Sequence, residues 1–322
     1  MHYKVKKLVS NLPSQAKTQD TLLINPWGIT IKDKTLWVSD NGSGVLTNYD
    51  LKGNKISSVK VAQIPMGLES APTGIIVNNT ENFRIGNGSI FVPATLLIAT
   101  ESNTVNAYNP YVDYNNAKVV IDGSSYGSVY KGLTIAGDLL LVADFMNGII
   151  NIYDKHFNLI LFKGSYIPFS DPTIQFLKYN PFNIVNIKDK IYILYAKQNS
   201  SNPQEEQPGI GYGYINEFSL NGEFIRRFAS NGELNAPWGM IEAPKKFGYP
   251  KGTLLVSNFG DGKINAYSNT GCHLGQLKLK NKKGDKIVLE GLWGLTKHHK
   301  HIYFASGPEE EENGLVGKFK KH

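Results

Sequence analysis

The chain has 322 residues, 41% of them hydrophobic and 11% aromatic, which suffices for a sizeable core and favours β-structure over helix. No stretch approaches the roughly 20 apolar residues of a membrane-spanning helix, and the single cysteine, Cys272, excludes an intramolecular disulfide. The net charge of +7 comes from scattered lysines, with arginine only at positions 84, 226 and 227, so we expect no nucleic-acid partner.

The first predicted element is a strand over residues 4–9. No apolar signal-peptide core precedes it, so we expect a soluble, intracellular protein without a membrane span. The strand has no hairpin partner of its own, and it is therefore free to pair with a distant part of the chain.

A short turn motif follows the first strand and recurs along the chain. Each copy places a Gly or Asn before an aliphatic residue, often after a Pro, as in residues 25–29 and 236–240. Repeats of this length are typical of propeller blades. The anchor positions, 46 to 58 residues apart, are Gly28, Gly74, Gly132, Asn183, Gly239 and Gly294.

Two runs with strand character follow each motif. The first run is almost continuously apolar, as expected of a strand buried on both faces, and the second alternates apolar with polar residues. Turns that combine Asn or Asp with Gly join the two runs, because these residues tolerate the positive φ of tight hairpins. The first runs cover residues 35–40, 96–101, 139–144, 191–196, 253–258 and 301–306, and the second cover residues 46–49, 105–108, 149–153, 214–218, 264–267 and 315–319.

The pattern predicts an all-β fold, a six-bladed β-propeller that forms a single domain over residues 1–322. The sixth repeat runs out of chain after its third strand, which would leave an open sheet edge. We therefore expect the strand at residues 4–9 to complete the last blade and close the ring. The fourth repeat carries a long polar loop over residues 197–209, which is either a lid or an exposed insertion.

The predicted site is one mouth of the central channel, which we call the upper mouth. In each blade the innermost strand begins on the face where the second strand ends, so both sets of termini surround this opening. Tryptophan at a concave mouth can stack on a sugar or another ring, and carboxylates with lysine can orient polar groups. The alternative is that the aromatic side chains simply fill the axis. The ligand-binding candidates are Trp27, Asn41, Thr73, Lys131, Asn183, Lys197, Trp238 and Trp293.

A second set of residues at the same mouth carries side-chain oxygen atoms that suit a hard cation such as Ca²⁺ or Mg²⁺. These candidates are Asp40, Glu101, Asp144 and Asn258. Because they recur as repeat positions, structural capping of the turns is the alternative, and we expect no other cofactor. We expect the histidine-rich residues 298–301 in an exposed turn on the opposite face and the glutamates 309–312 in a solvated hairpin loop.

Residues 25–29 with 37–42, and the equivalent segments 143–145 and 258–265, resemble NHL-like propellers. Repeats of that kind pair a Pro-x-Gly-Ile opening with a following Val-Ala-Asp hairpin. The chain is more closely similar to an uncharacterised propeller family found largely among bacterial exported proteins, some with a PEP-CTERM sorting tail. The resemblance implies a fold and no reaction, and it gives secretion or association with a particle as the alternative location.

Three functions are consistent with these patterns. The first is a non-enzymatic binding or scaffold propeller, expected as a monomer, whose upper-face loops engage a protein, a glycan or a small ligand. The second is a metal-assisted hydrolase or lyase of the lactonase kind that uses the acidic ring around the axis. The third is a structural component of a larger particle. The absence of any nucleophile elbow, phosphate loop, zinc-protease helix or dinucleotide fingerprint favours the first.

Overall fold

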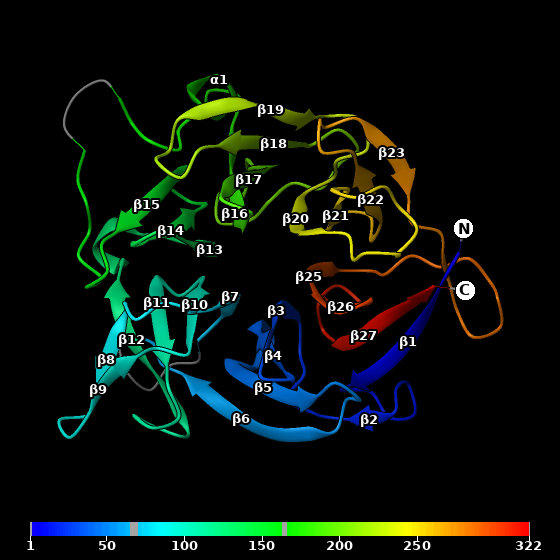
Figure 1. Cartoon of the computed structure of the whole chain (residues 1–322), viewed down its shortest axis with the longest axis horizontal. Helices are drawn as coiled ribbons and strands as arrows, with labels where there is room; N and C mark the ends of the chain where they lie inside the picture. The colour runs from blue at the N-terminus through cyan, green and yellow to red at the C-terminus, as the bar shows by residue number, and fades with distance from the viewer. Residues whose placement is uncertain (1, 65–69, 163–165, 322) are drawn as a thin grey trace.

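A computed structural model describes residues 2–64, 70–162 and 166–321. Antiparallel strand groups stand around a common axis and follow one another in chain order (Figure 1). Helical structure in the described ranges is limited to a short helix α1 (Pro172–Gln175) and the 3₁₀ turns η1 (Asn41–Ser43) and η2 (Ser124–Tyr126). The fold is therefore all-β and propeller-like. The described part of the chain contains no helix with the length and hydropathy needed to span a bilayer.

Within each group the strand nearest the axis comes first, and each following strand lies one step further out. The predicted apolar runs agree with the observed second strands to within one residue at each end. The short hairpin of β8 (Arg84–Gly86) and β9 (Phe91–Pro93) lies outside the second group. In chain order, the groups are β3 (Pro26–Lys32), β4 (Thr35–Asp40), β5 (Val45–Asp50) and β6 (Lys55–Val61); β7 (Pro72–Val77), β10 (Leu96–Thr100), β11 (Thr104–Tyr108) and β12 (Asn116–Asp122); β13 (Tyr130–Ala136), β14 (Leu139–Asp144) and β15 (Ile149–Tyr153); β16 (Tyr179–Ile187), β17 (Lys190–Lys197), β18 (Gly213–Phe218) and β19 (Phe224–Ser230); β20 (Pro237–Glu242), β21 (Leu254–Asn258), β22 (Ile264–Tyr267) and β23 (His273–Gln276); and β25 (Leu292–His298), β26 (His301–Ser306) and β27 (Leu315–Lys321).

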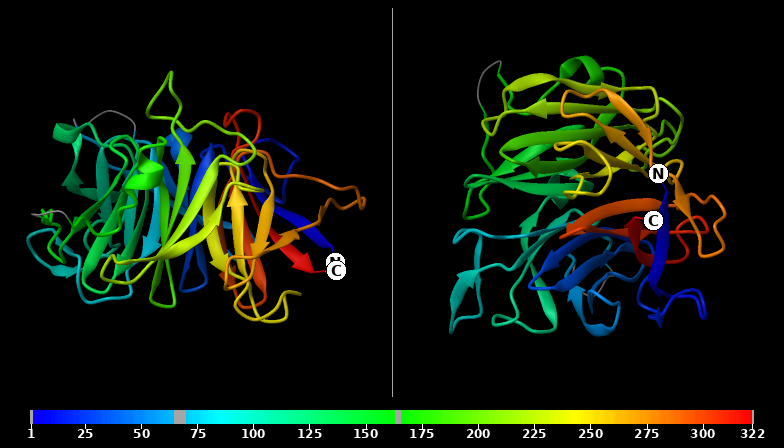
Figure 2. Two further views of the ribbon diagram at one scale, coloured as in Figure 1. Left: turned by 90° about the horizontal axis from the view of Figure 1, so that it is seen from above. Right: turned by 45° about the vertical axis from the view of Figure 1, so that its right-hand side comes forward.

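The N-terminal strand completes the last group. β1 (Tyr3–Ser10) pairs antiparallel with β27, with Val5 opposite Phe319. The short strands β2 (Thr18–Gln19) and β24 (Leu279–Lys280) pair with β1 in parallel. The two ends of the chain consequently lie side by side (Figure 2). The predicted pairing of the first strand with the last is confirmed.

The inner strands approach one another in a closed cycle, in the order β3, β7, β13, β16, β20 and β25, and then β3 again. Glycine at the anchor position permits this close approach, since a Cβ atom on Gly28 would lie only 2.5 Å from the carbonyl oxygen of Thr73 in β7. In β16 the anchor is Asn183 instead. Its side-chain amide donates a hydrogen bond to the carbonyl oxygen of Trp238 in β20 (2.8 Å). The anchor residues therefore set how closely neighbouring inner strands pack around the axis.

The second strand of each group is buried on both faces, as β4 illustrates. Leu36 and Val38 belong to a core cluster with Tyr303 of β26, in the last group. Trp37, on the opposite face of β4, packs into the cluster shared with the second group. Each fully buried Leu or Val contributes about 1.5 to 3 kcal/mol to folding. Burial on both faces explains the nearly continuous apolar runs in the sequence.

Three of the short hairpins between second and third strands contain a glycine in the left-handed region. The φ angles of Gly44, Gly148 and Gly262 are 67°, 70° and 66°. A side chain would strain the backbone in this conformation. The turn chemistry predicted for these hairpins is therefore confirmed.

Candidate functional site

Aromatic side chains fill the upper end of the axis, where the inner strands begin. Trp27, Trp238 and Trp293 belong to one buried cluster with Phe145 and Phe182. The rings of Trp27 and Trp293 stack with centroids 3.5 Å apart, and Trp238 meets both of them edge to face. Each tryptophan is at most 3% exposed, so the three candidate rings pack on one another.

Lys131 of β13 reaches into this aromatic cluster. Its ammonium nitrogen lies 5.2 Å from the ring centroids of Trp27 and Phe145 and 5.5 Å from that of Phe182. The side chain of Lys131 is completely buried. A buried ammonium group requires compensating negative charge, and the faces of the aromatic rings supply part of it.

Three carboxylates surround the Lys131 ammonium group. Glu101, which follows β10 and accepts a hydrogen bond from the side chain of Asn41 (2.8 Å), lies 3.0 Å away. Glu206 and Glu205, from the loop between β17 and β18, lie 3.1 and 3.4 Å away. Burial lowers the pKa of Lys131, but the carboxylates outweigh burial and raise the pKa, so the lysine stays charged. Burial raises the pKa of Glu206 despite the opposing effect of Lys131. These ion pairs fasten the long loop after β17 to the third group.

A fourth carboxylate, Glu311, comes from the loop between β26 and β27. It accepts a hydrogen bond from the side chain of Asn25, and burial together with the charge of Glu206 raises its pKa to about 7. Glu311 and the two residues before it all have positive φ, which is a strained conformation for residues with side chains. The prediction of a solvated loop over residues 309–312 is therefore incorrect for Glu311, which is partly buried, although the other three glutamates are exposed.

The remaining ligand-binding candidates have separate positions. The hydroxyl group of Thr73 donates a hydrogen bond to the carbonyl oxygen of Tyr130 (2.8 Å) and so joins β7 to β13. The ammonium group of Lys197 lies 4.3 Å from the ring centroid of Tyr212. Asn183 faces a cavity in the lower part of the axis. The structure thus gathers the tryptophans and Lys131 in one cluster and joins Asn41 to Glu101, whereas Thr73 and Lys197 make separate contacts.

The candidates for a cation site make hydrogen bonds within the protein. Asp40 accepts one from the backbone N–H of Thr47 (3.0 Å), and Asp144 accepts one from the side chain of Asn147 (2.9 Å). The side chain of Asn258 donates a hydrogen bond to the backbone carbonyl oxygen of Glu233 (2.7 Å). The fourth candidate, Glu101, forms an ion pair with Lys131. The bonds of Asp40 and Asp144 lie within their own hairpins, as the capping alternative describes, and the cation site stays a prediction. Among the residues whose positions are described, no group of three or more His, Cys, Asp or Glu side chains could hold a metal ion.

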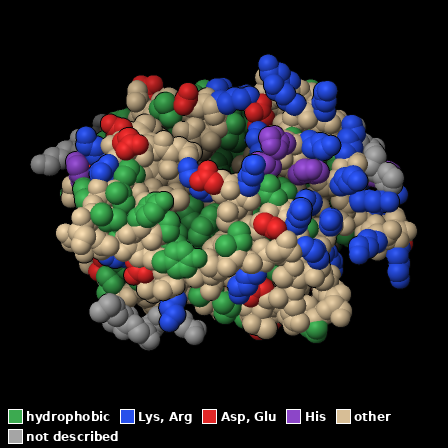
Figure 3. Space-filling model, turned by 60° about the horizontal axis from the view of Figure 1, so that its bottom comes forward, with side chains coloured by type: hydrophobic (Ala, Val, Ile, Leu, Met, Phe, Trp, Pro, Cys, Tyr) green, Lys and Arg blue, Asp and Glu red, His purple; other side chains and the backbone are tan. Residues whose placement is uncertain are grey.

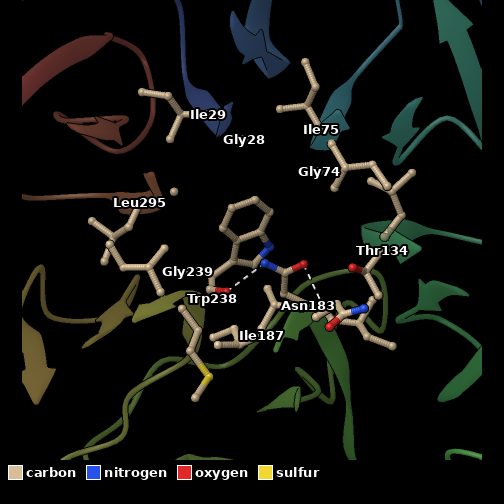
Figure 4. A pocket seen from close by; sticks show the side chains of 18 of the residues that line it. Gly28, Ile29, Gly74, Ile75, Thr134, Asn183, Ile187, Trp238, Gly239 and Leu295 are labelled. Atoms are coloured by element: carbon tan, nitrogen blue, oxygen red, sulfur yellow. Dashed lines mark hydrogen bonds between the residues drawn. The ribbon is translucent and has the colours of Figure 1, made fainter. Parts of the chain in front are cut away.

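A cavity of about 520 Å³ occupies the lower part of the axis (Figure 4). Its inner end is formed by Trp238 and Asn183, next to the aromatic cluster. Its wall contains the residue that directly follows each anchor position, and all of these residues are apolar. They are Ile29, Ile75, Leu133, Ile184, Met240 and Leu295.

Charged residues line the lower opening of this cavity, where the inner strands end. Glu242 at the end of β20 forms ion pairs with Lys188 and with Lys297 (3.6 Å). A hydrogen bond from Lys188 and the charge of Lys297 keep the pKa of Glu242 below its ordinary value. The space-filling view shows a hollow in the surface near clustered lysine and histidine side chains (Figure 3).

Sequence reasoning placed Lys131 and Glu101 at the upper mouth, but it missed the lower cavity and the other two carboxylates around Lys131, Glu205 and Glu206. The cavity had a signal in the repeat, because the wall position directly follows the anchor in every copy. Glu206 had none, since its partner Lys131 is 75 residues away and no local pattern connects them.

Comparison with known proteins finds close relatives in a virus. No protein-family model matches the sequence. Uncharacterized protein R648 of Acanthamoeba polyphaga mimivirus is 41% identical over 99% of this chain and 80% of the relative. The chain belongs to the family of R648. Uncharacterized protein L690 of the same virus is 40% identical over 99% of this chain and 86% of its own length. The expected relation to bacterial exported proteins stays a prediction.

Solved structures with the same fold are distant in sequence. A structural genomics protein of unknown function from Bacteroides thetaiotaomicron matches with a TM-score of 0.62 and 10% identity, over 98% of this chain and 75% of that protein. Virginiamycin B lyase from Staphylococcus aureus matches with a TM-score of 0.55 and 15% identity over the full length of both chains. At these identities the likeness supports the propeller-like fold alone.

Proposed function

We propose that residues 1–322 form a single six-bladed, NHL-like β-propeller that works as a non-enzymatic binding module for a small molecule. One blade opens at each anchor position, and the cycle of inner strands agrees with this blade count. The observation that carries the proposed function is the axial cavity of about 520 Å³.

The size and lining of this cavity fit a small ligand. Binding sites for small molecules are mostly apolar and measure about 300 to 1,000 Å³. The six residues after the anchors supply the apolar wall. Each inner strand is also the edge strand of its sheet, so that its free backbone N–H and C=O groups are available to polar atoms of a ligand.

Because aromatic side chains fill the upper end of the axis, a ligand would reach the cavity from the lower face. The tryptophans, with Phe145 and Phe182, occupy the axis above the cavity, and the loop that carries Glu206 is fastened beside them by Lys131. The space below is therefore a pocket with one opening. A ligand would enter from the lower face, past the ion pairs of Glu242.

The other candidate functions gain no specific support. Virginiamycin B lyase shares the fold at 15% identity, which does not extend its reaction to this protein. A metal-assisted reaction, a protein or glycan partner at the upper face and a role in a larger particle stay predictions.

The cavity can be tested with the uncharged fluorescent probe N-phenyl-1-naphthylamine, which brightens in apolar surroundings. Ile187 lines the cavity, so Ile187→Trp should fill it and abolish probe binding while the protein remains folded by circular dichroism. Ile210, which is 77% exposed, provides the matched control Ile210→Trp, which should bind like the wild type. Absence of binding to the wild type, or equal binding to Ile187→Trp, would refute the proposed function.

A further inference from the structure

A second depression adjoins the axial cavity on the lower face. It has a volume of about 920 Å³ and lies along the segment that follows β20, including Pro244, Tyr249 and Pro250. Lys188, Glu242 and Lys297 line both this groove and the axial cavity. A single molecule can therefore extend from the apolar cavity into the groove without leaving the protein surface.

The groove is strongly basic. Glu242 is its one acidic lining residue, and this carboxylate already forms ion pairs with Lys188 and Lys297. Three further lysines line the groove and form no ion pair with any residue that the structure describes. They are Lys245, Lys246 and Lys251. His298 and His299 also line the groove.

The surroundings of His298 are consistent with an excess of positive charge. Burial, together with the positive charges of His299 and Lys34, lowers the pKa of His298. Like charges that are not neutralised by the protein favour an anion from outside. The groove therefore has the electrostatic character of an anion site, whereas the cavity beside it is apolar.

We propose that the ligand of this protein is an amphipathic anion, with its apolar part in the axial cavity and its phosphate, sulfate or carboxylate group in the basic groove. This inference rests on the proposed function, since it requires the cavity to be the binding site. The free lysines Lys245, Lys246 and Lys251 supply the charge that selects the anionic group. Lys188 and Lys297 are held by Glu242 and shape the passage between the two spaces.

The enclosed position of the cavity favours a free small molecule over an extended polymer. The apolar wall is recessed between the inner strands, where a nucleic-acid backbone cannot follow. The groove also contains no arginine, the residue that best pairs with phosphate in a bidentate geometry.

A matched pair of probes distinguishes binding in the cavity from selection of an anionic group by the groove. 8-Anilinonaphthalene-1-sulfonate has the ring skeleton of N-phenyl-1-naphthylamine and adds one sulfonate group. In low salt, we expect the wild type to bind the sulfonate at least about tenfold more tightly than the uncharged probe. The reason is that several exposed ion pairs between the sulfonate and the groove lysines each contribute modestly to binding. Added salt should reduce this advantage.

The triple variant Lys245→Gln, Lys246→Gln and Lys251→Gln should lose the preference for the sulfonate and keep its affinity for the uncharged probe. The matched control replaces three exposed lysines that lie outside both spaces, with Lys52→Gln, Lys60→Gln and Lys155→Gln, and should keep the preference. If the uncharged probe binds and the sulfonate binds no more tightly, or if the triple variant keeps the preference, the amphipathic anion is excluded and the cavity remains. If neither probe binds, the proposed function fails as well.

Discussion

Replacing Lys131 by methionine tests the charge cluster at the upper end of the axis. Methionine keeps the unbranched shape and packs well against aromatic rings, so the variant removes the charge and little of the contact. Glu206, with 4% of its side chain exposed, would then be buried without its counter-ion, whereas the half-exposed Glu205 would remain solvated. Removal of one partner from a buried ion pair costs about 3 to 5 kcal/mol. We expect a decrease in melting temperature of roughly 4 to 8 °C, at about 1.5 °C per kcal/mol for a chain of 322 residues.

The loss of stability in Lys131→Met should depend on pH. Burial raises the pKa of Glu206 in the folded protein, and removal of Lys131 takes away the charge that opposes this shift. A carboxyl group whose pKa is higher in the folded than in the unfolded state destabilises the fold as the pH rises through the folded value. Melting curves followed by circular dichroism should therefore show a larger difference from the wild type near pH 8 than near pH 5.

Two further variants complete this test. Lys155→Met, at an exposed lysine without an ion pair among the described residues, should melt like the wild type. The double variant Lys131→Met with Glu206→Gln should recover part of the lost stability, because it no longer buries an unpaired charge. An unchanged melting temperature in Lys131→Met, or a double variant no more stable than the single one, would refute the reasoning.

Two other features give direct predictions. Deletion of residues 1–11 removes β1 and exposes the edge of β27, so the melting temperature should fall sharply, and an unchanged melting curve would contradict closure of the ring by β1. Glu311 has a pKa of about 7 in the folded protein against an ordinary value of 4.5, so this group destabilises the wild type progressively as the pH rises from about 4.5 to 7. Glu311→Gln lacks this effect, so its melting temperature relative to the wild type should increase between about pH 5 and pH 8. The exposed control Glu310→Gln should show no such trend. Equal behaviour of the two variants would show that Glu311 is not buried among charges.

Much of the strand arrangement could be predicted because its determinants are local. Burial of β4 on both faces requires the apolar run of residues 35–40, and the hairpin after it requires the left-handed Gly44. The pairing of β1 with β27 followed from a count of strands, since an unpaired strand at one end matched an incomplete group at the other. Such features depend on residues within one repeat, or on the number of strands available to complete each group.

The candidate site was predicted only in part. The ring placed Trp27, Trp238 and Trp293 together near the axis, as their equivalent repeat positions indicated. Whether such rings bind a ligand or pack on one another depends on the width of the axis. That width depends on how closely neighbouring inner strands approach one another. Gly28 permits a close approach, because a Cβ atom at this position would lie only 2.5 Å from the carbonyl oxygen of Thr73.

The sequence by itself determined the repeat, the turn glycines and the apolar wall position after each anchor, because sterics and burial act on each repeat separately. Only the tertiary structure decided which end of the axis is filled and which is open. It also decided that Glu206 meets Lys131 across 75 residues and that Lys188 and Lys297 meet at Glu242. These contacts join different strand groups, and the distances between their side chains are set when the groups close around the axis.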